Sequence, residues 1–133
     1  MKTPVVACVL SLLVLGCTSS VAANEDNWPR FRGPNGAGTA DFAIPAKWSE
    51  DTVRWETELP GEGHGSPVVW GDKIFLNAAR DKGTERLVVC VDATSGKVLW
   101  TKDFAFDTHK ANKRNSFASS TPAVDANAVY VAW

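Results

Sequence analysis

The sequence predicts an all-β fold: a partial β-propeller of about one and a half four-stranded antiparallel blades, preceded by a signal peptide and an irregular leader. Three observations lead to this prediction. From Val53 onward, short apolar runs alternate with turn residues, and several of these runs are apolar on both faces. The pattern also repeats after about 45 residues, the length of one propeller blade. Because strands with two apolar faces need cover on both sides, sheets stacked around an axis suit this sequence.

Residues 1–23 are expected to form an export signal. The apolar run at residues 5–16 has the length of a signal-peptide core and is too short to span a bilayer. Residues 14–17 read Val-Leu-Gly-Cys and resemble a bacterial lipoprotein box, which implies lipidation of Cys17. Small residues at 21–23 leave ordinary signal cleavage open as the alternative. The protein is therefore expected to be exported, either to the periplasm or to a membrane as an anchored lipoprotein.

Residues 24–52 are expected to form an irregular leader. Gly and Pro recur between residues 28 and 39, and they exclude a regular helix or a central strand there. Trp28 and Phe31 are expected to dock the leader on the body of the protein, with Trp48 as a second anchor.

Residues 53–133 are expected to form the first strands and blades. Gly71 suits the positive φ of a type II′ hairpin turn. A second tight turn is expected at residues 92–97, where Asp92 can accept hydrogen bonds from backbone N–H groups and Gly96 can take a left-handed conformation. The predicted strands cover residues 53–59, 66–70, 73–79, 86–92, 97–104, 119–124 and 128–133.

Two internal repeats support the prediction of blades. The segment 66–76 returns as 121–131, and the segment 53–59 returns as 98–104. The first repeat has the longer spacing, which indicates a loop insertion between blades at residues 109–117.

Residues 90–100 resemble the tryptophan-docking motif of pyrroloquinoline-quinone-like propellers, Ala-x-Asp-x-x-Thr-Gly-Lys-x-x-Trp. Cys90 replaces the Ala of the motif, and Ser95 replaces the Thr. The resemblance extends over residues 53–133 and implies that the docking tryptophans pack across to a neighbouring blade, an environment that suits a large ring with one N–H donor. The residues assigned to docking are Asp92, Gly96, Lys97, Trp100 and, through the repeat, Trp55.

The predicted strands are too few to close a ring. Propellers contain about four to eight blades, so the sequence is expected to be the amino-terminal part of a longer chain, truncated within its second blade. In ring propellers the last blade is often completed by an amino-terminal strand. Residues 53–59 are the candidate for that strand.

Several polar residues outside the motif allow both a functional and a structural interpretation. His64 could contact a ligand in the central channel, or it could be an ordinary loop histidine. Arg30 and Arg32 could bind anions, or their aliphatic stems could cover the leader. Cys90 is expected to be a buried, unreactive thiol. A basic loop could face an acidic partner or be a solvated surface, and it contains His109, Lys110, Lys113 and Arg114.

The sequence favours a non-catalytic binding or scaffolding propeller of the bacterial cell envelope, with protein partners or an envelope ligand. A net charge of -1 gives no reason to expect nucleic-acid binding. No residue is assigned to catalysis, to a metal or to a cofactor. The family resemblance also allows the amino-terminal part of an alcohol or sugar dehydrogenase, which would hold pyrroloquinoline quinone and calcium in the complete ring. A polysaccharide-binding or polysaccharide-processing accessory is a third possibility.

Overall fold

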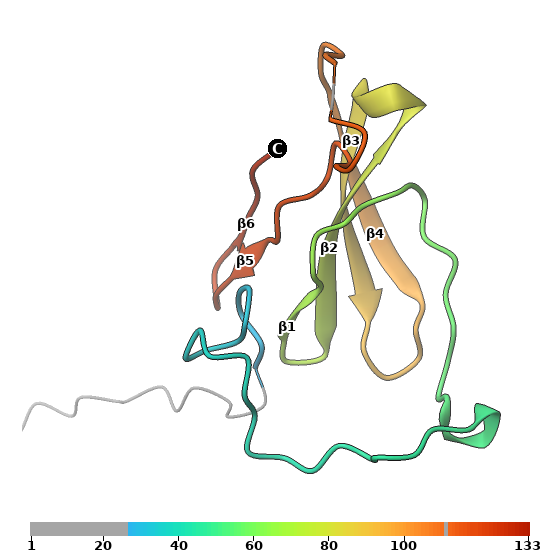
Figure 1. Cartoon of the computed structure of the whole chain (residues 1–133), viewed down its shortest axis with the longest axis vertical. Coiled ribbons are helices and arrows are strands. Elements are labelled where there is room, and N and C mark those ends of the chain that lie inside the picture. The colour runs from blue at the N-terminus through green and yellow to red at the C-terminus, as the bar shows by residue number, and fades with distance from the viewer. Residues whose placement is uncertain (1–26, 111) are drawn as a thin grey trace, which may run out of the picture.

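The computed structural model describes residues 27–110 and 112–133 of the chain (Figure 1). The expected export signal, with Cys17, lies outside the described residues. The described part is all-β, as predicted, apart from short 3-10 turns at Glu50–Thr52 (η1) and Asp81–Gly83 (η2). Its strands are β1 (Val68–Trp70), β2 (Lys73–Arg80), β3 (Glu85–Asp92), β4 (Val98–Ala105), β5 (Ala123–Val124) and β6 (Val129–Tyr130).

Strands β1 to β4 form one antiparallel sheet in sequence order, which is the arrangement of a single propeller blade. Strands β2 and β3 pair along their whole length, from Lys73 opposite Asp92 to Arg80 opposite Glu85. The bounds of β2, β3 and β4 agree with the predicted strands to within one residue at each end. Long apolar runs closed by turn residues explain this agreement.

The hairpin between β1 and β2 has the predicted turn. Trp70 pairs with Lys73, so Gly71 and Asp72 are the two loop residues. Gly71 has a φ of 58°, the left-handed value that the first loop residue of a type II′ turn requires.

Both faces of the sheet are covered along its central strands β2 and β3, as expected for stacked blades, whereas β4 is exposed. One face packs against Val124 of β5, and the other packs against the segment that carries Trp55. Strand β3 lies between these layers, and its six central residues are all buried. The first cluster is Val68, Phe75, Cys90 and Val124, and the second is Ala78, Leu87, Val89 and Val91.

Strand β4 differs from β3 because it is the outer strand of the sheet. Val98, Leu99 and Trp100 at its start are 40%, 48% and 42% exposed. The strand therefore presents an apolar surface as well as a free edge, since no other strand of the described residues pairs with its outer side.

Strands β5 and β6 form a second, two-stranded sheet beside the first (Figure 1). Strand β5 contacts β1, and the N–H of Ser66 donates to the hydroxyl of Thr121 at 3.0 Å. These two residues occupy equivalent positions of the repeat. Neighbouring repeats therefore meet at their first strands, β1 and β5, as blades do around the axis of a β-propeller.

The leader is anchored to both sheets by its first described residues. Trp28 exchanges two backbone hydrogen bonds of 2.9 Å with Val69 of β1, and the carbonyl of Pro29 accepts from the N–H of Val124 in β5. The docking predicted for Trp28 is confirmed. The anchors predicted at Phe31 and Trp48 are wrong, because these side chains are 61% and 79% exposed.

Four of the predicted strands are absent or shorter in the structure, including the one predicted at 66–70, which shortens to β1 at Val68–Trp70. Residues 53–59 form no strand with a partner among the described residues, and the segment contacts the β3–β4 turn through the side chains of Trp55 and Thr57. Their pairing with a last blade stays a prediction. The strands predicted at 119–124 and 128–133 shrink to β5 and β6, since only two residue pairs of the second hairpin form a ladder.

Candidate functional site

The turn between β3 and β4 is the centre of the predicted docking site. The carboxylate of Asp92 accepts hydrogen bonds from the N–H of Thr94 at 3.2 Å and the N–H of Ser95 at 2.7 Å. Hydrogen bonds from the hydroxyl and the backbone N–H of Ser95 hold the pKa of Asp92 below its ordinary value. Gly96 has a φ of 73°. The turn geometry predicted for Asp92 and Gly96 is therefore confirmed.

Trp55 packs on this turn from another part of the chain. Its indole N–H donates to the carbonyl of Ala93 at 3.1 Å. A Cβ at Gly96 would lie 2.6 Å from the Trp55 ring, so only glycine allows this approach. The hydroxyl of Thr57 donates to the carbonyl of Gly96 beside it. Trp55 therefore joins the segment before the first blade to the turn of that blade.

Trp100 has different surroundings from Trp55. Its ring is 42% exposed and lies 6.0 Å from the ring of Phe75, between centroids. It lines an apolar groove between the two sheets together with Trp70 and Val129. Lys97 is exposed and contributes its carbonyl, which accepts from the N–H of Asp92 at 2.8 Å. The structure thus brings Trp55, Asp92, Gly96 and Lys97 together and places Trp100 apart from them.

Cys90 is completely buried in the middle of β3. Burial raises the pKa of its thiol, so the nucleophilic thiolate is disfavoured. The prediction of an unreactive structural cysteine agrees with this environment.

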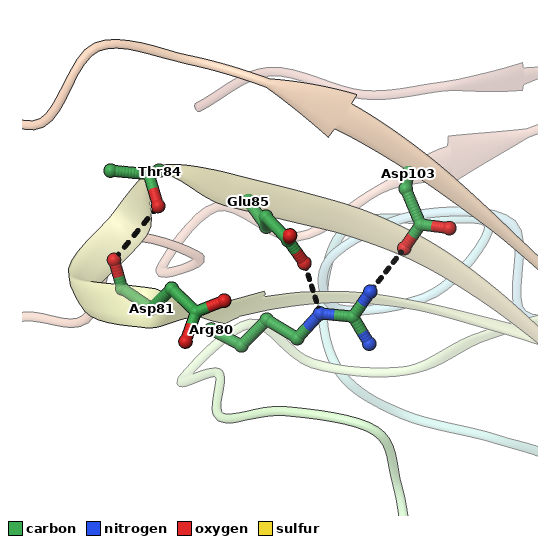
Figure 2. A network of polar contacts seen from close by, with 5 residues as sticks. All are labelled: Arg80, Asp81, Thr84, Glu85 and Asp103. Atoms are coloured by element: carbon green, nitrogen blue, oxygen red, sulfur yellow. Dashed lines mark hydrogen bonds and ion pairs between the residues drawn. The ribbon is translucent and has the colours of Figure 1, made fainter.

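The opposite end of the sheet carries a surface network of ionic groups. Figure 2 shows Arg80 of β2 between Glu85 of β3 and Asp103 of β4. The Nη2 of Arg80 donates to Asp103 at 3.2 Å. Thr84 closes the adjacent turn through a 2.9 Å bond from its hydroxyl to the carbonyl of Asp81. Because the charged groups are 41–52% exposed, these ion pairs contribute little to the free energy of unfolding.

His64 is exposed in a glycine loop that lies along the chain before β5. Its backbone N–H donates to the carbonyl of Ala118 at 3.0 Å. The flanking glycines are needed for close packing, because a Cβ at Gly63 or Gly65 would lie 2.6 or 2.2 Å from a backbone carbonyl oxygen. This environment favours the structural interpretation of these glycines.

The arginines of the leader interact within the leader. Arg30 donates from Nε to the carbonyl of Gly33 at 3.3 Å and from Nη2 to the carbonyl of Pro34 at 2.6 Å. The guanidinium of Arg32 lies 5.9 Å from the ring centroid of Phe31. These contacts stabilise the leader's turn and favour the structural interpretation of both residues.

Three residues of the predicted basic loop line two pockets, and Arg114 lines neither of them. His109 and Lys110 line one pocket together with Arg86, a residue that the sequence did not single out. Lys113 lines a second pocket that also contains His64 and Glu62. The sequence signal for Arg86 was a charged residue inside a mostly apolar strand, in which only the terminal residues Glu85 and Asp92 are also charged.

No helix within 27–110 or 112–133 is long and apolar enough to cross a membrane. The same residues contain no group of three or more His, Cys, Asp or Glu side chains placed to hold a metal ion.

Comparison with known proteins identifies a family. The sequence model of the family described as "Outer membrane protein assembly factor BamB" matches residues 44–132, more than half of the chain. The matched region includes Trp55, the docking turn and both sheets. Neither the curated proteins nor the solved structures contain a match.

Proposed function

This chain belongs to the pyrroloquinoline-quinone-like repeat family described as outer membrane protein assembly factor BamB, and from that membership we propose that it is a non-catalytic binding and scaffolding β-propeller of the bacterial cell envelope. Its partners would be envelope proteins. The family description supports outer-membrane protein assembly as the process in which it acts.

The observation that carries this proposal is the edge of β4, which no described strand covers, with its exposed apolar residues. A strand edge offers N–H and C=O groups to an incoming strand, and this is a common mode of protein recognition. Leu99 and Val98 add apolar surface beside the edge. In contrast, the carboxylate of Asp92 is engaged in capping a turn, and that of Asp125 accepts from the N–H of Asn127 and the hydroxyl of Tyr130.

A genetic test separates this proposal from the dehydrogenase alternative. Deletion of the gene should lower the amounts of outer-membrane proteins, and the wild-type gene should restore them. Leu99→Asp should fail to restore them because it places a charge beside the β4 edge. Val53→Asp is the matched control, since Val53 is 59% exposed and lies outside the sheet. Unchanged outer-membrane proteins, together with loss of dye-linked alcohol oxidation in the presence of quinone and calcium, would favour the enzyme.

We also propose that the protein is exported and anchored through lipidated Cys17. The proposal rests on the apolar run and the Val-Leu-Gly-Cys sequence. Labelled palmitate should be incorporated into wild-type protein and lost in Cys17→Ser. Cys8→Ser, within the apolar run, is the matched control and should keep the label. An unlabelled mature protein that begins at Asn24 would show ordinary signal cleavage instead.

A further inference from the structure

Arg86 is a buried cation with no carboxylate beside it among the described residues. Its side chain is 5% exposed, and its Nε donates to the carbonyl of Gly83 at 3.3 Å. The guanidinium lies 4.3 Å from the ring centroid of Phe106 and 5.9 Å from that of Phe117. Aromatic faces offset part of the cost of burying this charge, but they leave several N–H donors of the guanidinium without an anionic acceptor.

The pocket beside Arg86 is lined by a further cation, Lys110, and by polar side chains. Its volume is about 220 Å³, several times the roughly 30 Å³ that one water occupies. His109 and Lys110 contribute basic side chains to it, and no Asp or Glu is among its described lining residues. The hydroxyl-bearing residues of the wall are Ser116, Ser119 and Ser120.

Trp133 provides a second, independent observation in the same pocket. Its indole N–H is buried and has no hydrogen-bond partner among the described residues. The ring is fixed by Phe104 and Phe106, whose centroids lie 5.3 and 5.4 Å away. An indole N–H can only donate, so the group that satisfies it must be an acceptor.

We propose that this pocket binds a small oxyanion: sulfate, phosphate or a carboxylate group. Arg86 supplies paired N–H donors, Lys110 supplies additional positive charge, the imidazole of His109 can donate one hydrogen bond, and the indole N–H of Trp133 supplies a neutral donor. Such charge-assisted hydrogen bonds to an oxyanion are stronger than those between neutral groups. This inference is independent of the proposed scaffolding function, because it concerns the loop between the two sheets and not the edge of β4.

The indole N–H of Trp133 gives a direct readout by nuclear magnetic resonance. Its signal in a ¹⁵N–¹H spectrum is assigned with Trp133→Phe. Sodium sulfate, sodium phosphate and sodium acetate are then titrated into the wild-type protein at constant ionic strength, with chloride as the balancing anion. A saturable shift of this signal is expected with at least one of the three anions. Tighter binding of sulfate or phosphate indicates a tetrahedral ligand, and tighter binding of acetate indicates a carboxylate.

Variants test the residues of the pocket. Arg86→Gln should weaken binding about tenfold or more, the usual effect of losing a charge-assisted hydrogen bond. Lys110→Gln should weaken it by a smaller factor, and because Lys110 is exposed this variant keeps the fold. Arg54→Gln, an exposed arginine outside the pocket, is the control and should bind as the wild type does.

Three outcomes would overturn the proposal. The first is the absence of a saturable shift of the Trp133 indole signal with all three anions, or an equal shift when sodium chloride alone is added. The second is an Arg86→Gln protein that binds as tightly as the wild type. If Arg86→Gln does not fold, unchanged affinity in Lys110→Gln is the third.

Discussion

Trp55 and Trp100 occupy equivalent positions of the repeat, yet they make different contacts. Trp55 packs on Gly96 and donates to the carbonyl of Ala93, whereas Trp100 is 42% exposed and lines the groove between the sheets. The turn on which Trp55 packs belongs to the repeat that carries Trp100. The ring of the first repeat therefore packs on the turn of the second, whereas the ring of the second lies beside Phe75.

The largest difference is expected on truncation of the two rings. Trp55→Ala should lower the free energy of unfolding by about 3 kcal/mol, because it removes a packed ring and leaves the Ala93 carbonyl without its donor. Trp100→Ala should cost about 1 kcal/mol, since much of its ring is already in water. Urea unfolding followed by circular dichroism measures both values. Equal losses would contradict the different packing of the two rings.

The turn on which Trp55 packs should be the next most sensitive position. Gly96→Ala should cost about 2 kcal/mol, because the new Cβ meets the Trp55 ring and the backbone has a left-handed φ. Gly71→Ala is the matched control, with a φ of 58° and no atom within 4 Å of the new Cβ. It should cost about 1 kcal/mol from backbone strain alone. The same urea unfolding assay applies. An identical loss of unfolding free energy in both variants would show that the Trp55 ring moves aside from the new Cβ without cost.

The pH dependence of stability should change in Asp92→Asn. Hydrogen bonds from Ser95 lower the folded-state pKa of Asp92 below its ordinary 3.8. Its contribution is therefore present above the unfolded-state pKa and is lost as the pH falls through the lowered folded-state value. Urea midpoints measured from neutral pH into this acid range should fall less in Asp92→Asn than in the wild type. Parallel curves would show that the Asp92 carboxylate does not contribute.

The smallest effect is expected far from the docking turn. Arg80→Gln breaks the contacts with Glu85 and Asp103, but these groups are largely solvated. The urea midpoint at physiological salt should stay within experimental error of the wild type. A clear loss of stability would mean that the Arg80 network contributes to folding, as the Trp55 turn at the other end of the sheet does, despite its exposure to solvent.

Much of the first sheet could be predicted from the sequence. Strands β2, β3 and β4 follow from apolar runs, and the turns follow from Gly71 and Gly96, whose positive φ values are a local property of glycine. Burial of Cys90 follows in the same way from its position within an apolar run.

The predictions that failed have a common physical cause. Whether a segment becomes a strand, a buried anchor or a pocket wall depends on its neighbours in space, which the local sequence does not specify. Residues 53–59 have the composition of a strand, but their contacts are made by side chains to a turn about 40 residues away. Phe31 and Trp48 are aromatic without being buried. The environment of Arg86 could not be predicted, because its aromatic neighbours Phe106 and Phe117 follow only after β4 and in the loop beyond it.

The attachment of Trp28 to β1 and of Pro29 to β5 has a mechanical consequence. A pull on the amino terminus acts directly on the seam between the first two repeats, not on a loose end. With a lipid at Cys17, the stretch from there to Asn27 reaches at most about 35 Å when fully extended. The first blade would then be tethered close to the membrane surface. The contacts of Trp28 and Pro29 with β1 and β5 would bear any force between the blade and the membrane.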